Sequence, residues 1–346
     1  MPTTSPAPAG PPRLDHLELA AAERVRMTIS CHDTDSLPKV PGAGDVLLHE
    51  GTLVQRMHNG LLIEEGCYYG PWMTEIIRAL GGHHEPQEEL VFHRVLERLA
   101  ATEDAPTMVE LGSFWAYYTM WFLSSAGAGR AVCMEPDPAY LDVGRRNLAL
   151  NGLSATFVHG AVGREPGFRT TFTAESTGED VDVVQHDLAS LLAATDLDRV
   201  SLLMVDIQGF EIPLLERAAD LLRGGRVRFA IVSTHHHQIS GDPLTHQRTL
   251  ALLRECGAHV IAEHSVGESY SGDGLVAVSF DERDRDLTVE VSHARARDSL
   301  FGELEPDLAA AREDARVARA ELDALRRSTS WRVTAPLRAI VRLHRR

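Results

Sequence analysis

Two glutamates each close a short apolar segment of the 346-residue chain, and their spacing suggests a shared binding site. Glu110 ends MVE at residues 108–110, and Glu135 ends RAVCME at residues 130–135. If both segments are parallel strands, their carboxyl ends meet at one edge of a sheet, where such sheets bind ligands. Gly112 would allow a tight turn beside Glu110. Glu135 would accept hydrogen bonds from both hydroxyls of a ribose.

The turn after Glu110 excludes a dinucleotide as the ligand. A pyrophosphate requires the G-x-G-x-x-G pattern, because the backbone must approach it over several residues. Here Gly112 is followed by Ser113, Phe114 and Trp115. S-adenosylmethionine has no phosphate, but it carries an ammonium, a sulfonium and a ribose, which suit acidic strand ends. We therefore expect it as the cofactor, with Ser113 and Pro136 beside the two glutamates.

A third strand end offers chemistry to the bound ligand. Asp206 follows the apolar run SLLMV, and three consecutive histidines, His235–His237, follow the next strand. His235 or His236 would act as a general base toward an acceptor hydroxyl. Alternatively, Asp206 with His235 would hold a divalent metal that acidifies the hydroxyl. A polar loop without catalytic function is the third interpretation.

The elements that position these residues alternate between strands and helices. Apolar strands are expected near residues 108–112, 130–136, 155–163, 201–209, 228–237, 259–264 and 274–280. Helices are expected between them, except between the third and fourth strands and between the last two. Strands separated by helices form a parallel sheet covered on both faces. The sequence predicts an α/β, Rossmann-like fold with a seven-stranded, mostly parallel sheet whose last strand inserts antiparallel. Residues 164–197 show a less regular pattern.

Three ordered motifs resemble those of the FkbM-type class I S-adenosylmethionine-dependent methyltransferases. They are ELGSFWAYYT, MEPDPAYLDVGRRNLALNG with its paired asparagines, and SLLMVDIQGFEIPLLERA. The resemblance covers about residues 83–265 and implies a hydroxyl acceptor on a sugar or natural product. It places Glu110 and Gly112 at the methionine end and Asp206 facing the reaction. It also places Gly160 and Ala161 at the adenine edge.

Three positions depart from the family pattern. Phe114 stands where a small asparagine is usual, Ala116 where the second glycine is usual, and Gln208 where an acid is usual. The Phe114–Trp115 pair would reshape the cofactor pocket.

Composition limits the class of protein. The formal net charge is −16, which argues against a nucleic-acid partner. No run of about 18 apolar residues would span a bilayer. The four cysteines form no C-x-x-C pair and fit reduced thiols in the cytoplasm. Residues 1–19 form a Pro/Ala-rich leader without the apolar region of a secretion signal.

The segments that flank the methyltransferase region, residues 85–280, have other compositions. Residues 20–84 are expected to form a cap whose histidines and aromatics, among them His58, Tyr68 and Tyr69, would wall an acceptor pocket or simply pack. Residues 281–346 should be a helical extension with a basic amphipathic tail. This tail, STSWRVTAPLRAIVRLHRR, resembles a terminal segment of bacterial polysaccharide-assembly glycosyltransferases. It would contact a partner protein or the inner membrane face.

The sequence thus predicts an O-methyltransferase that modifies a hydroxyl of a saccharide or glycosylated natural product. The alternative is a catalytically silent, methyltransferase-like scaffold in a glycan-assembly complex, which the altered first motif keeps open.

Overall fold

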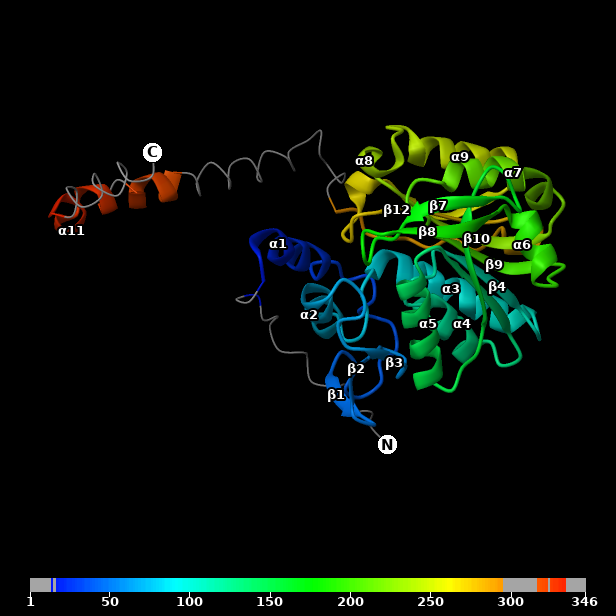
Figure 1. The fold of residues 1–346 in the computed structure, drawn as a ribbon, viewed down its shortest axis with the longest axis horizontal. Helices are drawn as coiled ribbons and strands as arrows, with labels where there is room; N and C mark the ends of the chain where they lie inside the picture. The colour runs from blue at the N-terminus through cyan, green and yellow to red at the C-terminus, as the bar shows by residue number, and fades with distance from the viewer. Residues whose placement is uncertain (1–13, 15–16, 295–315, 323, 334–346) are drawn as a thin grey trace. The chain divides into compact units, whose positions relative to one another are not determined.

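In the computed structural model, the chain divides into two compact units, Met1–Ala294 and Arg295–Arg346 (Figure 1). The structure describes residue 14 and residues 17–294, 316–322 and 324–333. In the second unit, residues 316–322 and 324–327 are helical, and α11 covers Thr329–Val333. Of the expected extension, residues 281–294 belong to the first unit, and residues 295–315, 323 and 334–346 lie outside the described residues.

The first unit is built on a nine-stranded sheet of order β11-β12-β10-β9-β4-β5-β6-β8-β7. Its strands are β4 (Thr107–Leu111), β5 (Arg130–Glu135), β6 (Thr156–Val162), β7 (Arg169–Thr173), β8 (Asp180–His186), β9 (Val200–Val205), β10 (Val227–Thr234), β11 (His259–His264) and β12 (Gly274–Ser279). Strands β6, β5, β4, β9 and β10 run parallel, and β12 runs antiparallel to both β10 and β11. This is the class I methyltransferase arrangement that the sequence predicts.

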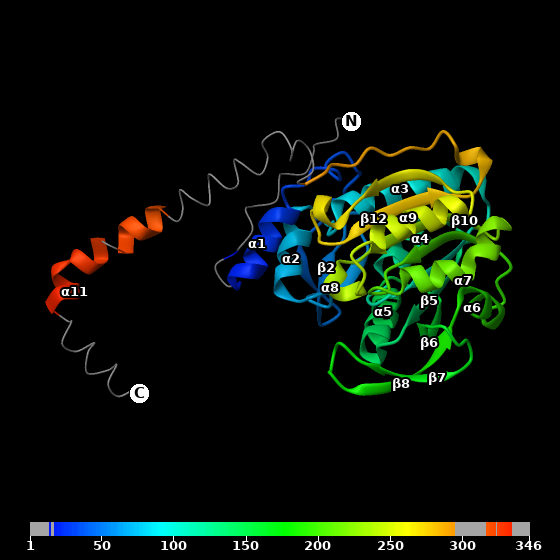
Figure 2. The same ribbon diagram turned by 90° about the horizontal axis from the view of Figure 1, so that it is seen from above.

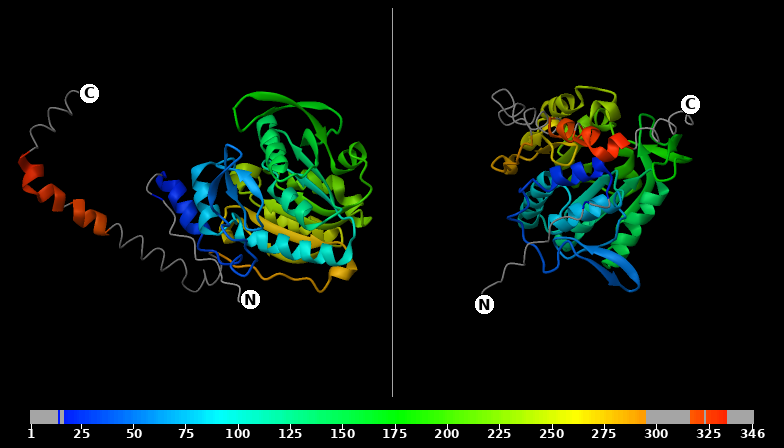
Figure 3. Two further views of the ribbon diagram at one scale, coloured as in Figure 1. Left: turned by 90° about the horizontal axis from the view of Figure 1, so that it is seen from below. Right: turned by 90° about the vertical axis from the view of Figure 1, so that its left-hand side faces the viewer.

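The expected number of seven strands was wrong, because β7 and β8 extend the sheet beyond β6. They form an antiparallel hairpin, and β8 runs parallel to β6. The hairpin projects from the edge of the sheet (Figure 3, left). Strand β7 alternates exposed and partly buried residues, and no residue of β8 but Val183 is fully buried, so neither strand has the apolar run that identifies a central strand.

Helices cover both faces of the sheet (Figure 2). The helices of the first unit that follow the cap are α3 (Pro86–Thr102), α4 (Tyr117–Ser125), α5 (Pro138–Leu150), α6 (Leu188–Ala194), α7 (Glu211–Arg223), α8 (His237–Ser240) and α9 (Thr245–Glu255), with short 3₁₀ turns η1 (Val266–Glu268) and η2 (Glu282–Asp284). Helices α1 (Leu19–Thr28) and α2 (Pro71–Ala79) contact each other in the N-terminal part of the unit. Successive strand residues alternate between two apolar clusters: Leu202 and Met204 lie in one, Leu203 and Val205 in the other. The central strands are therefore buried on both faces.

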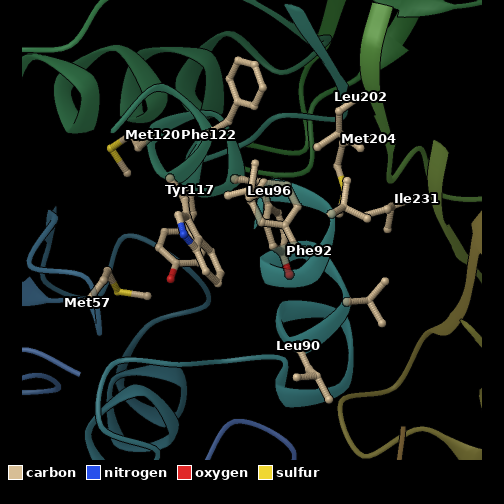
Figure 4. Close-up of a cluster of buried hydrophobic side chains, with 14 of the residues drawn as sticks. Met57, Leu90, Phe92, Leu96, Tyr117, Met120, Phe122, Leu202, Met204 and Ile231 are labelled. Atoms are coloured by element: carbon tan, nitrogen blue, oxygen red, sulfur yellow. The ribbon is translucent and has the colours of Figure 1, made fainter. Parts of the chain in front are cut away.

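One of these clusters joins the sheet to the N-terminal cap. Phe92 of α3, Tyr117 of α4 and Met204 of β9 lie in it together with Met57, which belongs to the cap (Figure 4). The cap contains a small antiparallel sheet of β1 (Val46–His49), β2 (Thr52–Arg56) and β3 (Leu62–Glu64). Continuous apolar packing makes the cap part of the same compact unit.

Asn147 of α5 and Asn151, which caps the C-terminal end of this helix, hold the cap in place. The side chain of Asn147 accepts a hydrogen bond from the Glu64 backbone at 2.9 Å and donates one to the carbonyl of Trp115 at 3.1 Å. Asn151 accepts from the Leu62 backbone at 2.8 Å and donates back to its carbonyl at 2.7 Å. The edge strand β3 thereby pairs with side chains in place of a further strand.

Candidate active site

A cavity of about 690 Å³ opens at the carboxyl ends of β4, β5, β6 and β9. Its volume lies in the range of small-molecule sites. All seven residues expected at the cofactor line it, and so does Asp206. The seven are Glu110, Gly112, Ser113, Glu135, Pro136, Gly160 and Ala161. The structure therefore brings the sequence motifs together around one space.

The loop between β4 and α4 is shaped by an unusual backbone. Gly112 has φ of 78°, and a Cβ there would lie 1.7 Å from the carbonyl oxygen of Asp206, so only glycine fits. Phe114 and Ala116 also adopt left-handed conformations, with φ of 36° and 57°. These are the positions where the family has asparagine and glycine, which tolerate that region better. Such strain often marks a functional loop.

Glu110 is a buried carboxyl group facing the cavity. It accepts a hydrogen bond from the backbone nitrogen of Thr119 in α4 at 3.1 Å. Burial raises its pKa to about 8. A cation in the cavity would restore its negative charge, because an opposite charge favours the ionised form.

Glu135 is oriented by the strained loop. Its carboxylate accepts one hydrogen bond from the backbone nitrogen of Phe114 and one from that of Asp137, each at 3.0 Å. Burial raises its pKa to about 7. A carboxylate has about four lone-pair sites, so two remain for hydroxyl groups of a ligand. Beside it, the buried Ser113 hydroxyl has no hydrogen-bond partner in the described part of the chain, which also fits a polar ligand.

Asp206 and His235 lie in contact, as expected from the sequence. His235 Nε2 lies 3.0 Å from Asp206 Oδ1, and His235 Nδ1 lies 2.7 Å from Glu211 Oε1. Burial alone would lower the pKa of His235, but the hydrogen bonds to Asp206 and Glu211 raise it to about 11. The ring is therefore protonated at neutral pH. The protonated ring has no lone pair for a further proton, which argues against His235 as the general base. Its role with Asp206 in a metal site stays a prediction, because a bound cation would displace that proton.

Two neighbours complete the surroundings of Asp206. The amide of Gln208 donates a hydrogen bond to Asp206 Oδ1 at 3.2 Å, where the family's acid would repel it. His236 accepts a hydrogen bond from the backbone nitrogen of Gln238 at the start of α8. His236 lies outside the residues that line the cavity, so its expected base role is not supported either.

The cap supplies an aromatic and charged wall of the cavity. Tyr68 stacks on Trp115 with ring centroids 4.5 Å apart, and Tyr69 lies beside it. Glu85 accepts a hydrogen bond from the Tyr118 hydroxyl at 3.3 Å. Burial tends to lower the pKa of His84, but Glu85 and Glu89 raise it to about 10. The expected aromatic contribution of the cap to the pocket thus has a structural basis.

Other lining residues were missed from the sequence. Tyr140 of α5 stacks on Phe114 with centroids 3.6 Å apart, and residues 170–173 of β7 with Glu175 close another side. The alternation of exposed and partly buried positions in β7 could have indicated a strand here, but the segment is short and polar.

Comparisons with known proteins agree with this geometry. Residues 101–260 match the family model of the methyltransferase FkbM domain. Over these residues the chain is similar to that domain, as the motifs predicted. Its sheet has the mostly parallel order with an antiparallel β12 that is expected of a class I S-adenosylmethionine-dependent methyltransferase fold. No curated protein sequence matches the chain.

Solved structures with a similar arrangement include three methyltransferases. The METTL16 methyltransferase domain is 17% identical over 57% of this chain and 69% of its own, with a TM-score of 0.38. The ribosomal protein L11 methylase of Lactobacillus delbrueckii is 15% identical over 57% and 80%, with a TM-score of 0.35. The precorrin-6y C5,15-methyltransferase of Geobacter metallireducens is 14% identical over 54% and 86%, with a TM-score of 0.35.

Proposed function

We propose that the chain transfers a methyl group from S-adenosylmethionine to a hydroxyl of a saccharide or glycosylated natural product. The observation that carries this proposal is the single cavity into which Glu110, Glu135 and Asp206 all face. Acidic groups at three strand ends suit a cationic nucleoside, and the volume leaves room for part of an acceptor.

The donor is held by the chain's own carboxyl groups. Glu135 offers two free acceptor sites to the ribose hydroxyls, as expected from its place at the end of β5. Glu110 faces the positive charge of the methionine portion. Gly160 and Ala161 line the adenine side of the cavity, where Gly160 presents no side chain.

Asp206 is the group that we assign to the acceptor. The acceptor oxygen attacks the methyl carbon, and the bond from that carbon to sulfur breaks. S-adenosylhomocysteine leaves with an uncharged thioether sulfur. The hydroxyl proton passes to the Asp206 carboxylate. His235 is a positioning residue, because its imidazolium holds Asp206 from behind while Glu211 fixes the other ring nitrogen. Positioning is most of what the reaction requires, since the sulfonium is already activated.

The acceptor class is supported by the cap wall. Tyr68 and Tyr69 present aromatic faces beside Glu85, a combination suited to stacking on a sugar ring and accepting its hydroxyl hydrogen bonds. The scaffold alternative rests on Phe114 and Ala116. Both nevertheless adopt the left-handed backbone, and Phe114 still donates to Glu135, which favours a working cofactor loop.

Calorimetry and turnover separate the two functions. We expect the full chain to bind S-adenosylmethionine, and a screen of sugars and glycosides with radiolabelled donor to yield a methylated hydroxyl. Asp206→Asn should abolish turnover while retaining donor binding, and Glu255→Ala, on an exposed end of α9, should change neither. Absence of donor binding up to millimolar concentration would favour the scaffold.

The cellular setting also belongs to the proposal. Among the described residues, no helix is long and apolar enough to cross a membrane. We place the protein in the cytoplasm, with the basic tail after Trp331 contacting a partner or the inner membrane surface. Removing residues 328–346 should leave methyl transfer intact and reduce sedimentation with anionic vesicles.

A further inference from the structure

Two buried histidines lie outside the donor cavity and have no part in the proposed reaction. His58 follows β2, and His83 precedes α3. Their rings stack with centroids 4.1 Å apart at an angle of 19°, and the residues are 3% and 0% exposed. The edge of the Trp121 ring packs on His58. Buried imidazoles require partners for both ring nitrogens.

One nitrogen of each ring is held by a polar group. His83 Nδ1 faces the Glu89 carboxylate, and His58 Nδ1 lies 3.0 Å from the Tyr117 hydroxyl. That hydroxyl in turn donates to Glu89 Oε2 at 3.5 Å. Metal-binding histidines characteristically have one ring nitrogen fixed by a carboxylate or another polar group, which orients the other nitrogen toward the ion.

The second nitrogen of His83 lacks such a partner. His83 Nε2 is buried and makes no hydrogen bond to any described residue. Leaving a buried acceptor unsatisfied is unfavourable, so the atom points to a missing ligand. A ligand that satisfies a nitrogen lone pair is either a hydrogen-bond donor or a metal ion.

The geometry points to a metal, and we propose that His58 and His83, with Glu89 beside them, bind one divalent transition-metal ion. One potential ligand atom from each of the three residues lies within 4.8 Å of the other two. Zinc–nitrogen bonds of about 2.0–2.1 Å in a tetrahedral site bring the ligand atoms closer together, so binding requires the two rings to turn out of their stacked arrangement. Imidazole ligands favour Zn²⁺ and similar ions over Mg²⁺ and Ca²⁺, which prefer oxygen.

A second cavity gives the ion a route and room for water ligands. It measures about 340 Å³ and is lined by His58, His93 and Glu97, among others. The site would join the cap loop after β2 to the start of α3 and, through Tyr117, to α4. We therefore assign it a bracing role between cap and sheet that does not depend on the methyl-transfer proposal.

Zinc uptake by the untagged full chain tests the site. After removal of metals and incubation with Zn²⁺, elemental analysis should find one zinc per wild-type chain and background zinc in His58→Gln and His83→Gln. His236→Gln/His237→Gln removes two adjacent histidines at the protein surface and serves as the matched control, which should still bind one zinc. Circular dichroism would show whether each variant is folded.

Two measurements on the wild-type chain keep the test independent of variant folding. X-ray absorption at the zinc edge should show imidazole nitrogens at about 2.0–2.1 Å. The melting temperature should rise with Zn²⁺ and not with Mg²⁺. Background zinc in the wild-type chain, an oxygen-only coordination shell, or loss of the ion in the His236→Gln/His237→Gln control would overturn the proposal.

Discussion

At the scale of single residues, protonation decides which groups can act. Asp206 and His235 were expected as partners in base or metal chemistry, and they are in contact. The carboxylates on both sides of His235 raise its pKa to about 11, so the ring is a cation paired with Asp206 and Glu211 and does not accept a further proton. The pKa values of Glu110 and Glu135 are also raised, but here the neutral form is favoured, because burial disfavours their negative charge.

Glu135→Ala should weaken the affinity for S-adenosylmethionine by about 1.5–3 kcal/mol, the range for hydrogen bonds to a charged group. In the wild-type chain, the affinity should increase as pH rises through about 7, because burial raises the pKa of Glu135 to about 7 and the ligand favours the ionised form. Calorimetry at pH 6 and 8 measures both effects. An affinity unchanged by the substitution would refute the ribose-binding role.

Glu110→Gln should stabilise the ligand-free protein at alkaline pH. Burial raises the pKa of Glu110 in the folded protein to about 8. The neutral acid therefore stabilises the fold fully at pH values below the pKa of this group in the unfolded chain. This stabilisation is lost as the pH rises through about 8. The amide imitates the neutral acid at every pH. We expect the free energy of unfolding of the variant to exceed that of the wild type by several kcal/mol at pH 9, since each pKa unit corresponds to about 1.4 kcal/mol, and to match it near pH 4.

Urea unfolding at the two pH values measures this difference. An equal difference at pH 4 and pH 9 would contradict the protonation argument.

At the scale of secondary-structure elements, contacts between helix ends and loops build the cavity. Asn147 lies in α5 and connects this helix to two other segments. It makes hydrogen bonds to the backbone of Glu64 in β3 and to that of Trp115 in the loop between β4 and α4. The hairpin of β7 and β8 supplies another wall. Its turn is held by Asp137, which caps α5 and accepts hydrogen bonds from the backbone and hydroxyl of Ser176.

Asn147→Ala should lower the free energy of unfolding by about 1–3 kcal/mol, because it leaves buried backbone groups of the cap and loop without partners. Donor affinity should fall as well, since the loop loses its anchor. Arg146→Ala is the matched control: its ion pair with Glu64 is half-exposed and should contribute about 0–1 kcal/mol. Equal effects of the two substitutions in denaturant unfolding would argue against the anchoring role.

At the scale of the whole molecule, one buried arginine joins segments that are distant in sequence. Arg228 of β10 pairs with Asp284 of η2 at 2.7 Å and with Glu103 beyond α3 at 2.7 Å. Both Arg228 and Asp284 are almost fully buried. The cluster holds the C-terminal end of the first unit against the sheet.

Arg228→Met should destabilise the fold by about 3–5 kcal/mol, because it leaves the Asp284 carboxylate buried without its cation. Arg228→Met/Asp284→Leu should recover most of that loss, since apolar replacement of both partners is often close to neutral. Thermal and denaturant unfolding of the two variants test this. A double variant no more stable than the single one would contradict the ion-pair explanation.

The sequence by itself determined the order of core strands and helices and the positions of Glu110, Glu135 and Asp206 at strand ends. These features follow from local periodicity and from the rule that parallel strands open their carboxyl ends to one side. Tertiary structure decided the β7–β8 extension, the enclosure by Tyr68 and the proton on His235. Each of these depends on segments far apart in the chain, whose approach sets burial and electrostatic environment and leaves no mark in a short stretch of sequence.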